Sequence, residues 1–155
     1  MKEPAKDTTI LKKLYAYCAY QDRCRKEIEE KMKEWELPEE EWESWMAHLE
    51  AERFWDEARF VKSFVRGKFF HKQWGPLKIR QELRQRDIPE QMISATLARE
   101  IPHEEFTQTL EKLIDKKWRE YRETNRDKLI RFLLQKGYKW DEFGKMLPQE
   151  HKEDL

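Results

Sequence analysis

The sequence is poor in the two residue types that make tight turns. Its 155 residues include only 4 Gly and 6 Pro, and an average protein uses roughly twice that share. The glycines stand isolated at positions 67, 75, 137 and 144, so they form no phosphate-cradling loop and no dinucleotide-binding motif. An all-β fold also needs many more turns than these residues can supply. We therefore expect few turns and long regular segments.

Long apolar runs are missing as well. No segment reaches the roughly 18 uncharged apolar residues of a membrane span, and the polar start Met1–Asp7 lacks the apolar region of a signal peptide. The only cysteines are Cys18 and Cys24, which on one helix would lie about 9 Å apart along the axis, too far for a disulfide. We expect a cytoplasmic protein with two free thiols and no membrane contact.

Catalytic and metal-binding motifs are also missing. His48, His71, His103 and His151 each stand without a Cys or a second His at ligand spacing. Acidic residues are so frequent that carboxylate pairs say little about acid–base catalysis. The sequence thus predicts no catalytic residue, no metal and no cofactor, and we expect that the protein is not an enzyme.

Charge and aromatic residues are abundant. Charged residues make up 41% of the chain and hydrophobic residues only 38%, with a mean hydropathy of −1.10. Such a composition suits a disordered segment or an elongated helical protein with much surface. The 7 Trp, 8 Phe and 5 Tyr favour the folded alternative, because a disordered chain has little use for so much apolar area.

One sequence pattern occurs three times. Ile28, Met32 and Pro38 recur 51 residues later as Ile79, Leu83 and Pro89, and a further shift of 50 carries the two apolar positions to Leu129 and Leu133. Apolar residues within each copy follow a helical period. The predicted fold is all-α, with three tandem three-helix repeats that resemble helix-turn-helix units in an elongated, curved arrangement. The predicted limits are 1–9 for an N-terminal tail, 10–52, 53–101 and 102–148 for the repeats, and 149–155 for a C-terminal tail.

Local residues predict where helices begin and end. Asp56 is a candidate N-cap, Pro76 and Pro89 suit first helical positions, Thr124–Asp127 resembles a capping box, and Gly137 is placed to end a helix. Most aromatic residues lie in helical stripes and are predicted to be core. The core set includes Trp42, Trp45, Phe64, Trp118 and Phe143, and the short last helix is expected to use Trp140. Phe70 and Trp74, between two helices, are left open.

The zero net charge hides an uneven distribution. Residues 1–50 hold 9 basic and 13 acidic side chains, residues 51–100 hold 11 and 7, and residues 101–155 hold 12 and 12. The window from Arg59 to Arg86 has 9 basic residues and one acid, a net charge of +8. Arg59, Lys62 and Arg66 fall within about 60° of one another on a helix and predict a basic stripe. The alternative is an ordinary solvated face on which long stems cover apolar surface.

Two further charged segments are less distinctive. The segment from Lys112 to Lys139 has 10 basic and 4 acidic residues and is a weaker candidate for the same kind of surface. The acidic run Glu39–Glu41 at the start of a predicted helix is best explained by the helix dipole. A docking patch for a basic partner is the other interpretation.

The middle repeat resembles the RecX family. Acidic residues open a helix at Asp56 and Glu57 with an aromatic close behind at Phe60, and Gly75, Ile79 and Leu83 follow in the next helix. The segment 132–138 is similar to the family's third repeat and the segment 24–32 to its first. Asp87 departs from the pattern, because the family often has Gly before Ile88. The first repeat is also more acidic than we expect for the family, so it is a weaker part of any shared binding surface than the other two.

The resemblance implies a regulator, typically an inhibitor, of the bacterial recombinase RecA in DNA repair and homologous recombination. It implies a monomer that binds along the RecA filament on single-stranded DNA and lowers strand exchange and ATP hydrolysis. The alternative is a helical-repeat protein that binds single- or double-stranded DNA through the backbone, without RecA. A scaffold for another protein is a third hypothesis. The candidate contacts are Arg59, Lys62, Arg66, Lys68, Lys72, Lys78, Arg80, Arg84, Arg86, Lys116, Lys117, Arg119, Arg122, Arg126, Lys128 and Arg131.

Overall fold

The computed structural model describes residues 8–149, which form α-helices, two short helical turns and no strand. The predicted all-α class is therefore confirmed for this part of the chain. The helices are α1 (Thr8–Tyr20), α2 (Arg25–Glu34), α3 (Glu39–Ala51), α4 (Glu57–Arg66), α5 (Pro76–Gln85), α6 (Glu90–Glu100), α7 (His103–Glu120), α8 (Arg126–Lys136) and α9 (Trp140–Phe143). A π-helical turn, η1 (Gly67–His71), extends α4, and a 3₁₀ turn, η2 (Gly144–Met146), follows α9.

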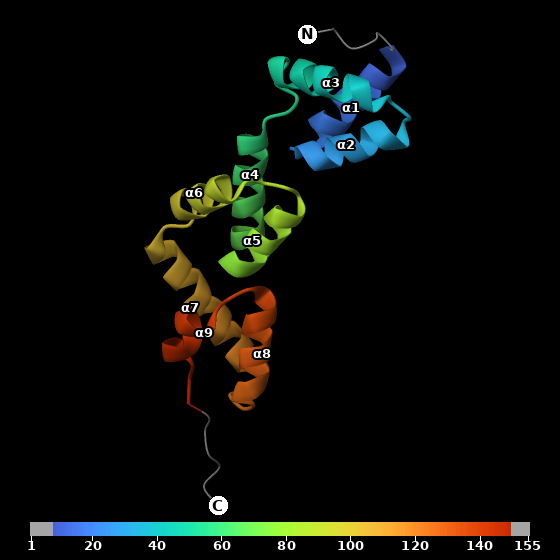
Figure 1. Cartoon of the computed structure of the whole chain (residues 1–155). Helices are drawn as coiled ribbons and strands as arrows, with labels where there is room; N and C mark the ends of the chain where they lie inside the picture. Colours follow the sequence, from blue (N-terminus) through green and yellow to red (C-terminus); the bar gives the residue numbers. More distant parts are fainter. Residues whose placement is uncertain (1–7, 150–155) are drawn as a thin grey trace, which may run out of the picture.

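The helices form three groups that follow one another along an elongated molecule (Figure 1). Unit 1 consists of α1–α3, unit 2 of α4–α6 with η1, and unit 3 of α7–α9 with η2. The described chain starts in unit 1 at one end and finishes in unit 3 at the other. Such an arrangement exposes a long surface to a partner, as in other proteins built from stacked repeats.

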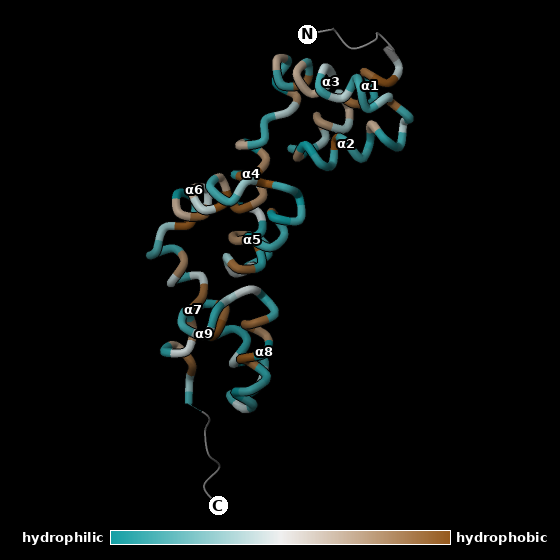
Figure 2. The backbone as a smooth tube through the Cα atoms, viewed as in Figure 1, coloured by the Kyte–Doolittle hydropathy of each residue, from teal (hydrophilic) through white to brown (hydrophobic). Residues whose placement is uncertain are grey.

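Each unit has a hydrophobic core. Unit 1 packs around Leu14, Ile28 and Trp45, and unit 3 packs around Leu110, Leu133 and Tyr138. In unit 2 the core contains Val61, Val65, Phe69, Ile79, Leu83 and Ile93. The half-buried Phe106, at the start of α7, packs against the cores of both unit 2 and unit 3. Figure 2 shows the apolar stretches grouped within each unit, whereas the loops between helices are mostly hydrophilic.

The second helix of every unit ends in the same way. The amide of Leu37 donates to the carbonyl of Met32 at 2.8 Å, and Ile88 donates to Leu83, as Tyr138 does to Leu133, at 3.1 Å. This six-residue closure, with an apolar contact between its two ends, is the Schellman motif. Its recurrence at offsets of 51 and 50 residues shows that the repeat in the sequence is a repeat in the structure.

Several helix ends lie where the sequence placed them, and two do not. Asp56 is the N-cap of α4, its side chain accepts from the amide of Arg59, and Pro76 occupies the first turn of α5. Pro89, predicted at the first helical position, is instead the N-cap of α6. The predicted capping start at Thr124 is also wrong, because Asn125 caps α8 by accepting from the amide of Lys128. Asn tolerates the left-handed conformation found there (φ 64°).

Two further expectations concern single side chains. Cys18 and Cys24 are both free, as predicted. Both are also buried, and burial raises the pKa of their thiols to about 11 and about 12. Trp140, expected to pack in the last unit, is 53% exposed. It begins α9 and lies against Phe143 and the backbone of Gly144 at the surface.

Candidate binding surface

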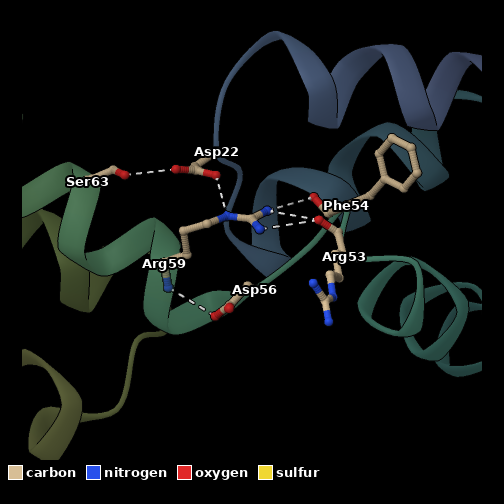
Figure 3. A network of polar contacts seen from close by, with 6 residues as sticks. All are labelled: Asp22, Arg53, Phe54, Asp56, Arg59 and Ser63. Carbon is tan, nitrogen blue, oxygen red and sulfur yellow. Dashed lines mark hydrogen bonds and ion pairs between the residues drawn. The ribbon is translucent and has the colours of Figure 1, made fainter.

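Arg59, the first residue of the predicted basic stripe, lies at the junction between units 1 and 2 (Figure 3). Its Nε donates to the Asp22 carboxylate at 2.7 Å, and its terminal nitrogens donate to the carbonyl of Arg53 at 3.2 Å and of Phe54 at 3.4 Å. Ser63 donates to the other oxygen of Asp22 at 2.8 Å. We call this network the Arg59 junction. The guanidinium of Arg59 is therefore engaged in contacts between units 1 and 2 within the chain.

Other contacts extend across the same junction. The Glu57 carboxylate accepts from the free amide of Arg25 at the start of α2, at 3.1 Å. Such a bond satisfies a helix N-terminal donor that has no partner within its own helix. Lys26 donates to the carbonyl of Gln85 at 2.6 Å and lies 3.8 Å from the Asp87 carboxylate. These links between units 1 and 2 all depend on side chains.

Several other cations of the predicted window also have acidic partners within the chain. Lys62 lies 3.8 Å from Glu100, whose side chain is only 8% exposed. Arg80 and Arg84 both hold Glu90, Arg84 through its Nε at 2.8 Å. Arg86 pairs with Glu82 at 3.1 Å. The charge of the window is therefore partly neutralised by acids outside it, namely Asp22, Glu90 and Glu100, in addition to Glu82 within it.

The carboxylate of Glu90 is held by two cations. Its hydrogen bond with Arg84, supported by Arg80, lowers the pKa of Glu90 to about 2. Arg80 also donates to the hydroxyl of Ser94 at 2.9 Å. This group joins α5 to the first turns of α6, so we assign these two arginines to the packing of unit 2.

Four of the predicted cations of unit 2 form no ion pair within residues 8–149. They are Arg66, Lys68, Lys72 and Lys78. Three of them lie over aromatic rings, Arg66 over Phe70 at 5.1 Å, Lys68 over Trp74 at 4.7 Å and Lys78 over Trp74 at 4.2 Å. Lys72 is exposed at the end of η1. A cation over a ring keeps its charge available to an anion, unlike one that is bound to a carboxylate.

The predicted cations of unit 3 are more loosely arranged. Lys116, Arg119, Arg122 and Arg131 are exposed, Lys117 binds Glu120 at 2.8 Å, and Lys128 lies 4.5 Å from the centre of the Tyr121 ring. Arg126 is half-buried at the start of α8. The structure therefore spreads these residues along α7, its end and α8, without gathering them into one pocket.

Units 2 and 3 meet through the backbone. The amide of Gly75 donates to the carbonyl of Lys136 at 2.7 Å, and that of Leu77 donates to the carbonyl of Gly137 at 3.1 Å. The C-terminal end of α8 thus occupies the free N-terminal donors of α5, where opposite dipole ends attract. A Cβ on Gly75 would overlap the Gly137 carbonyl. We call this contact the glycine junction, and only residues without side chains permit it.

The glycine junction places Lys136 among other lysines. Its Nζ donates to the carbonyl of Lys72 at 3.0 Å. Partial burial, followed by the nearby charges of Lys78, Lys117, Lys72 and Lys116, lowers the pKa of Lys136. Lys136, Trp74 and Phe132 were not among the predicted contacts. Trp74 and Phe132 meet cations that come from other segments of their own units, and Lys136 meets Lys72 only because units 2 and 3 are stacked, so a local sequence pattern did not single them out.

Two negative findings complete the description. In the described part of the chain, no three His, Cys, Asp or Glu side chains are grouped so as to hold a metal ion. None of the helices described is long and apolar enough to span a bilayer.

Comparison with protein families points to one family. The model for the second three-helix domain of RecX matches residues 56–97, and that for the third matches residues 103–144. Together these segments make up more than half of the chain. They correspond to the cores of units 2 and 3, which carry the cations described above.

Individual relatives agree. The chain is 31% identical over 126 residues to the regulatory protein RecX of Oceanobacillus iheyensis, and the match covers 79% of this chain and 46% of that protein. The RecX of Limosilactobacillus reuteri is 35% identical over 126 residues, which cover 79% and 47% of the two chains. The RecX of Haemophilus influenzae is 28% identical, with 82% and 85% covered. The chain spans about half the length of the first two relatives.

Solved structures show the same fold. A crystal structure of a regulatory protein RecX superposes with a TM-score of 0.71 at 28% identity, over 93% of this chain and 79% of the other. RecX from Lactobacillus salivarius superposes with a TM-score of 0.74 at 22% identity, over 87% and 92%. With two domain models, several relatives and this fold in agreement, the chain belongs to the RecX family, whose matched members are named regulatory proteins.

Proposed function

We propose that this chain regulates RecA, by binding along the RecA filament on single-stranded DNA and inhibiting its ATPase and recombinase activities. Membership of the RecX family supports a regulatory role. The observation that carries the proposal for this chain is the elongated stack of three units, in which exposed cations of the predicted set that form no ion pair among the described residues lie in units 2 and 3. A long charged surface can contact successive subunits of a filament.

The proposed contacts are those members of the predicted set that the structure leaves available to a partner. Arg66, Lys72, Lys116, Arg119, Arg122 and Arg131 are exposed and form no ion pair within the described residues. Arg59, Arg80 and Arg84 are occupied by internal acids, so we assign them to the shape of the surface. The proposed limits of the three repeats remain 10–52, 53–101 and 102–148.

The test measures ATP hydrolysis by RecA on single-stranded DNA with increasing amounts of the chain. We expect the wild type to inhibit, and the triple variant Arg66→Glu, Arg119→Glu, Arg122→Glu to need at least about tenfold more protein for the same inhibition, since each lost charge contact contributes about 1 kcal/mol. The matched control is Lys12→Glu, Lys33→Glu, Lys145→Glu, which changes charge by the same amount at exposed lysines outside the proposed set. Failure of the wild type to bind the filament or alter its ATPase would contradict the proposal.

A further inference from the structure

Cations and aromatic rings alternate across one side of unit 2. The guanidinium of Arg86 lies 4.9 Å from the centre of the Phe64 ring, and Lys68 lies 5.4 Å from the same ring. Lys68 also contacts Trp74 at 4.7 Å, and Lys78 contacts the Trp74 ring at 4.2 Å. The order is therefore Arg86, Phe64, Lys68, Trp74 and Lys78. These residues come from α4, η1, the loop after it, α5 and the C-cap of α5.

Cations and rings continue into unit 3, with two lysines adjacent where the units meet. Lys78 lies against Gly137, directly after Lys136, and Lys136 lies 5.8 Å from the centre of the Phe132 ring. Lys117 approaches that ring at 4.7 Å. We call the whole set the cation–aromatic strip. It is formed by Arg86, Phe64, Lys68, Trp74, Lys78, Lys136, Phe132 and Lys117.

The strip rests on a fixed backbone. The Tyr138 hydroxyl donates to the carbonyl of Gln73 at 3.1 Å, and Lys136 donates to that of Lys72, so unit 3 holds the loop that carries Trp74. The loop follows η1, and π-helical turns occur often at functional sites. With the glycine junction beneath it, the middle of the strip has little freedom to move. A preorganised surface loses less entropy when a ligand binds.

The charge of the strip is largely unopposed. Lys68, Lys78 and Lys136 have no acidic partner among the residues that the structure describes, and partial burial together with the surrounding like charges lowers the pKa of Lys136. Acids occur only at the two ends, where Glu82 binds Arg86 and Glu120 binds Lys117. Asp22 and Glu27 of unit 1 also line the pocket of about 510 Å³ beside Phe64 and Arg86. An anion is therefore favoured in the middle of the strip, over Trp74 and Lys136.

We infer that the cation–aromatic strip binds single-stranded nucleic acid directly, with phosphates on Lys68, Lys78 and Lys136 and bases on the rings of Phe64, Trp74 and Phe132. The inference rests on the proposed function, in which the DNA of the filament is within reach. An acidic protein surface would be recognised by cations alone, whereas half-buried rings between the cations match the spacing of charge and flat base in a nucleic acid. Single strands are favoured because their bases are free to stack.

Fluorescence anisotropy with a labelled oligothymidylate of about 15 nucleotides, the length that one small binding domain covers, tests the inference without RecA. We expect the variant Lys68→Glu, Lys78→Glu, Lys136→Glu to bind at least about tenfold more weakly and to reduce the slope of log affinity against log salt by about 2. Lys12→Glu, Lys33→Glu, Lys145→Glu is again the matched control, and we expect it to keep most of the affinity.

Aromatic variants test the stacking separately. We expect Trp74→Ala to weaken oligothymidylate binding by at least about fivefold, as for the loss of one stacked base, and Trp74→Phe to restore most of the affinity. Trp140→Ala, which removes an exposed Trp outside the strip, should leave binding unchanged. Circular dichroism of each variant checks that the helices are intact, and Trp74→Phe keeps a ring in place should Trp74→Ala unfold.

The outcomes separate the two proposals. The inference is overturned if the wild type does not bind the oligonucleotide, or if the strip variant binds it as well as the control. It is also overturned if the strip variant keeps its oligonucleotide affinity but loses its effect on RecA, because the strip would then be a protein contact. Strip-dependent oligonucleotide binding with no effect on the RecA ATPase would support the inference and contradict the proposed function.

Discussion

The second helix of each unit ends at one residue in the left-handed conformation, and these three residues occupy equivalent positions in the repeats. They are Glu36 (φ 58°), Asp87 (φ 59°) and Gly137 (φ 101°). The departure of Asp87 from the family's usual Gly therefore leaves the helix end unchanged, because Asp adopts this region more readily than most residues. Glu36 has no such advantage and is exposed. Residues without a short polar side chain pay about 1 kcal/mol there.

Replacing Glu36 by Gly should stabilise the protein. We expect the free energy of unfolding to rise by about 0.5–1 kcal/mol, since the relief of the left-handed strain exceeds the added chain entropy of Gly in the unfolded state. Urea unfolding followed by circular dichroism measures the change. Gly137→Ala is the opposite control and should destabilise by more, because its Cβ would also press on Lys78. A destabilised Glu36→Gly variant would show that the Glu36 side chain makes a contact of greater value.

Glu90 predicts a dependence of stability on pH. Its pKa in the folded protein is about 2, below the ordinary 4.5, so its contribution is present above pH 4.5 and is lost as the pH falls toward 2. We expect Glu90→Gln to be less stable than the wild type at pH 7, with a difference that shrinks between pH 5 and pH 2. Thermal unfolding at a series of pH values measures it. Glu50→Gln, an exposed acid at the end of α3, should show no such trend, and equal trends in both variants would count against the Arg84–Glu90 assignment.

At the scale of the helix, the two internal junctions are built differently. Units 2 and 3 join by backbone hydrogen bonds at Gly75 and Gly137, whereas units 1 and 2 join through the side chains of Arg59, Asp22 and Glu57. The backbone hydrogen bonds between units 2 and 3 form only because the two main chains approach closely, and a Cβ on either glycine would prevent this approach. We therefore expect the contact between units 2 and 3 to be disrupted by adding a side chain at a glycine, and the contact between units 1 and 2 by removing a charged side chain.

Gly75→Ala tests the glycine junction. The backbone at Gly75 is extended (φ −71°) and accepts Ala, but the added Cβ would overlap Gly137, so we expect a loss of about 1–3 kcal/mol. Gly67→Ala is the matched control: its Cβ meets nothing within 4 Å at a helical φ of −65°, and it should stabilise by about 0.5–1 kcal/mol. Denaturant unfolding compares the two. Equal stability of both variants would mean that units 2 and 3 can separate without cost.

The positions of the helices could be predicted from the sequence, but which cations form ion pairs within the fold could not. Apolar periods, Asp56, Pro76 and Gly137 each act within one helix or one turn, so their positions followed from local pattern. The acids that neutralise Arg59 and Lys62 lie 37 and 38 residues away, at Asp22 and Glu100. The net charge of a sequence segment does not show which of its cations form ion pairs with acids elsewhere in the fold. The sequence leaves the role of Trp74 open and shows Lys136 only as one cation of the weaker segment Lys112–Lys139, because the contacts of both depend on segments that the fold brings together.

At the scale of the whole molecule, the curvature of the repeats determines whether one surface can follow a filament. Units 2 and 3 share Phe106, the glycine junction and the Tyr138–Gln73 bond, which together hold them in one orientation. Unit 1 places Cys24 against the core of unit 2, but its orientation depends largely on charged side chains (Figure 3). The angle between units 1 and 2 is therefore the one that a small change should alter.

Asp22→Ala should loosen that angle while leaving the helices intact. The variant loses the ion pair with Arg59 and the hydrogen bond from Ser63, and Arg59 keeps only its bonds to carbonyls. In small-angle X-ray scattering we expect a larger radius of gyration and a broader distance distribution than for the wild type, with unchanged circular dichroism. High salt should move the wild type in the same direction by screening the pair. Asp115→Ala, an exposed acid on α7, is the control. A scattering profile of Asp22→Ala identical to that of the control would show that the other contacts, including Cys24 in the core and the bonds of Glu57 and Lys26, fix unit 1 without Asp22.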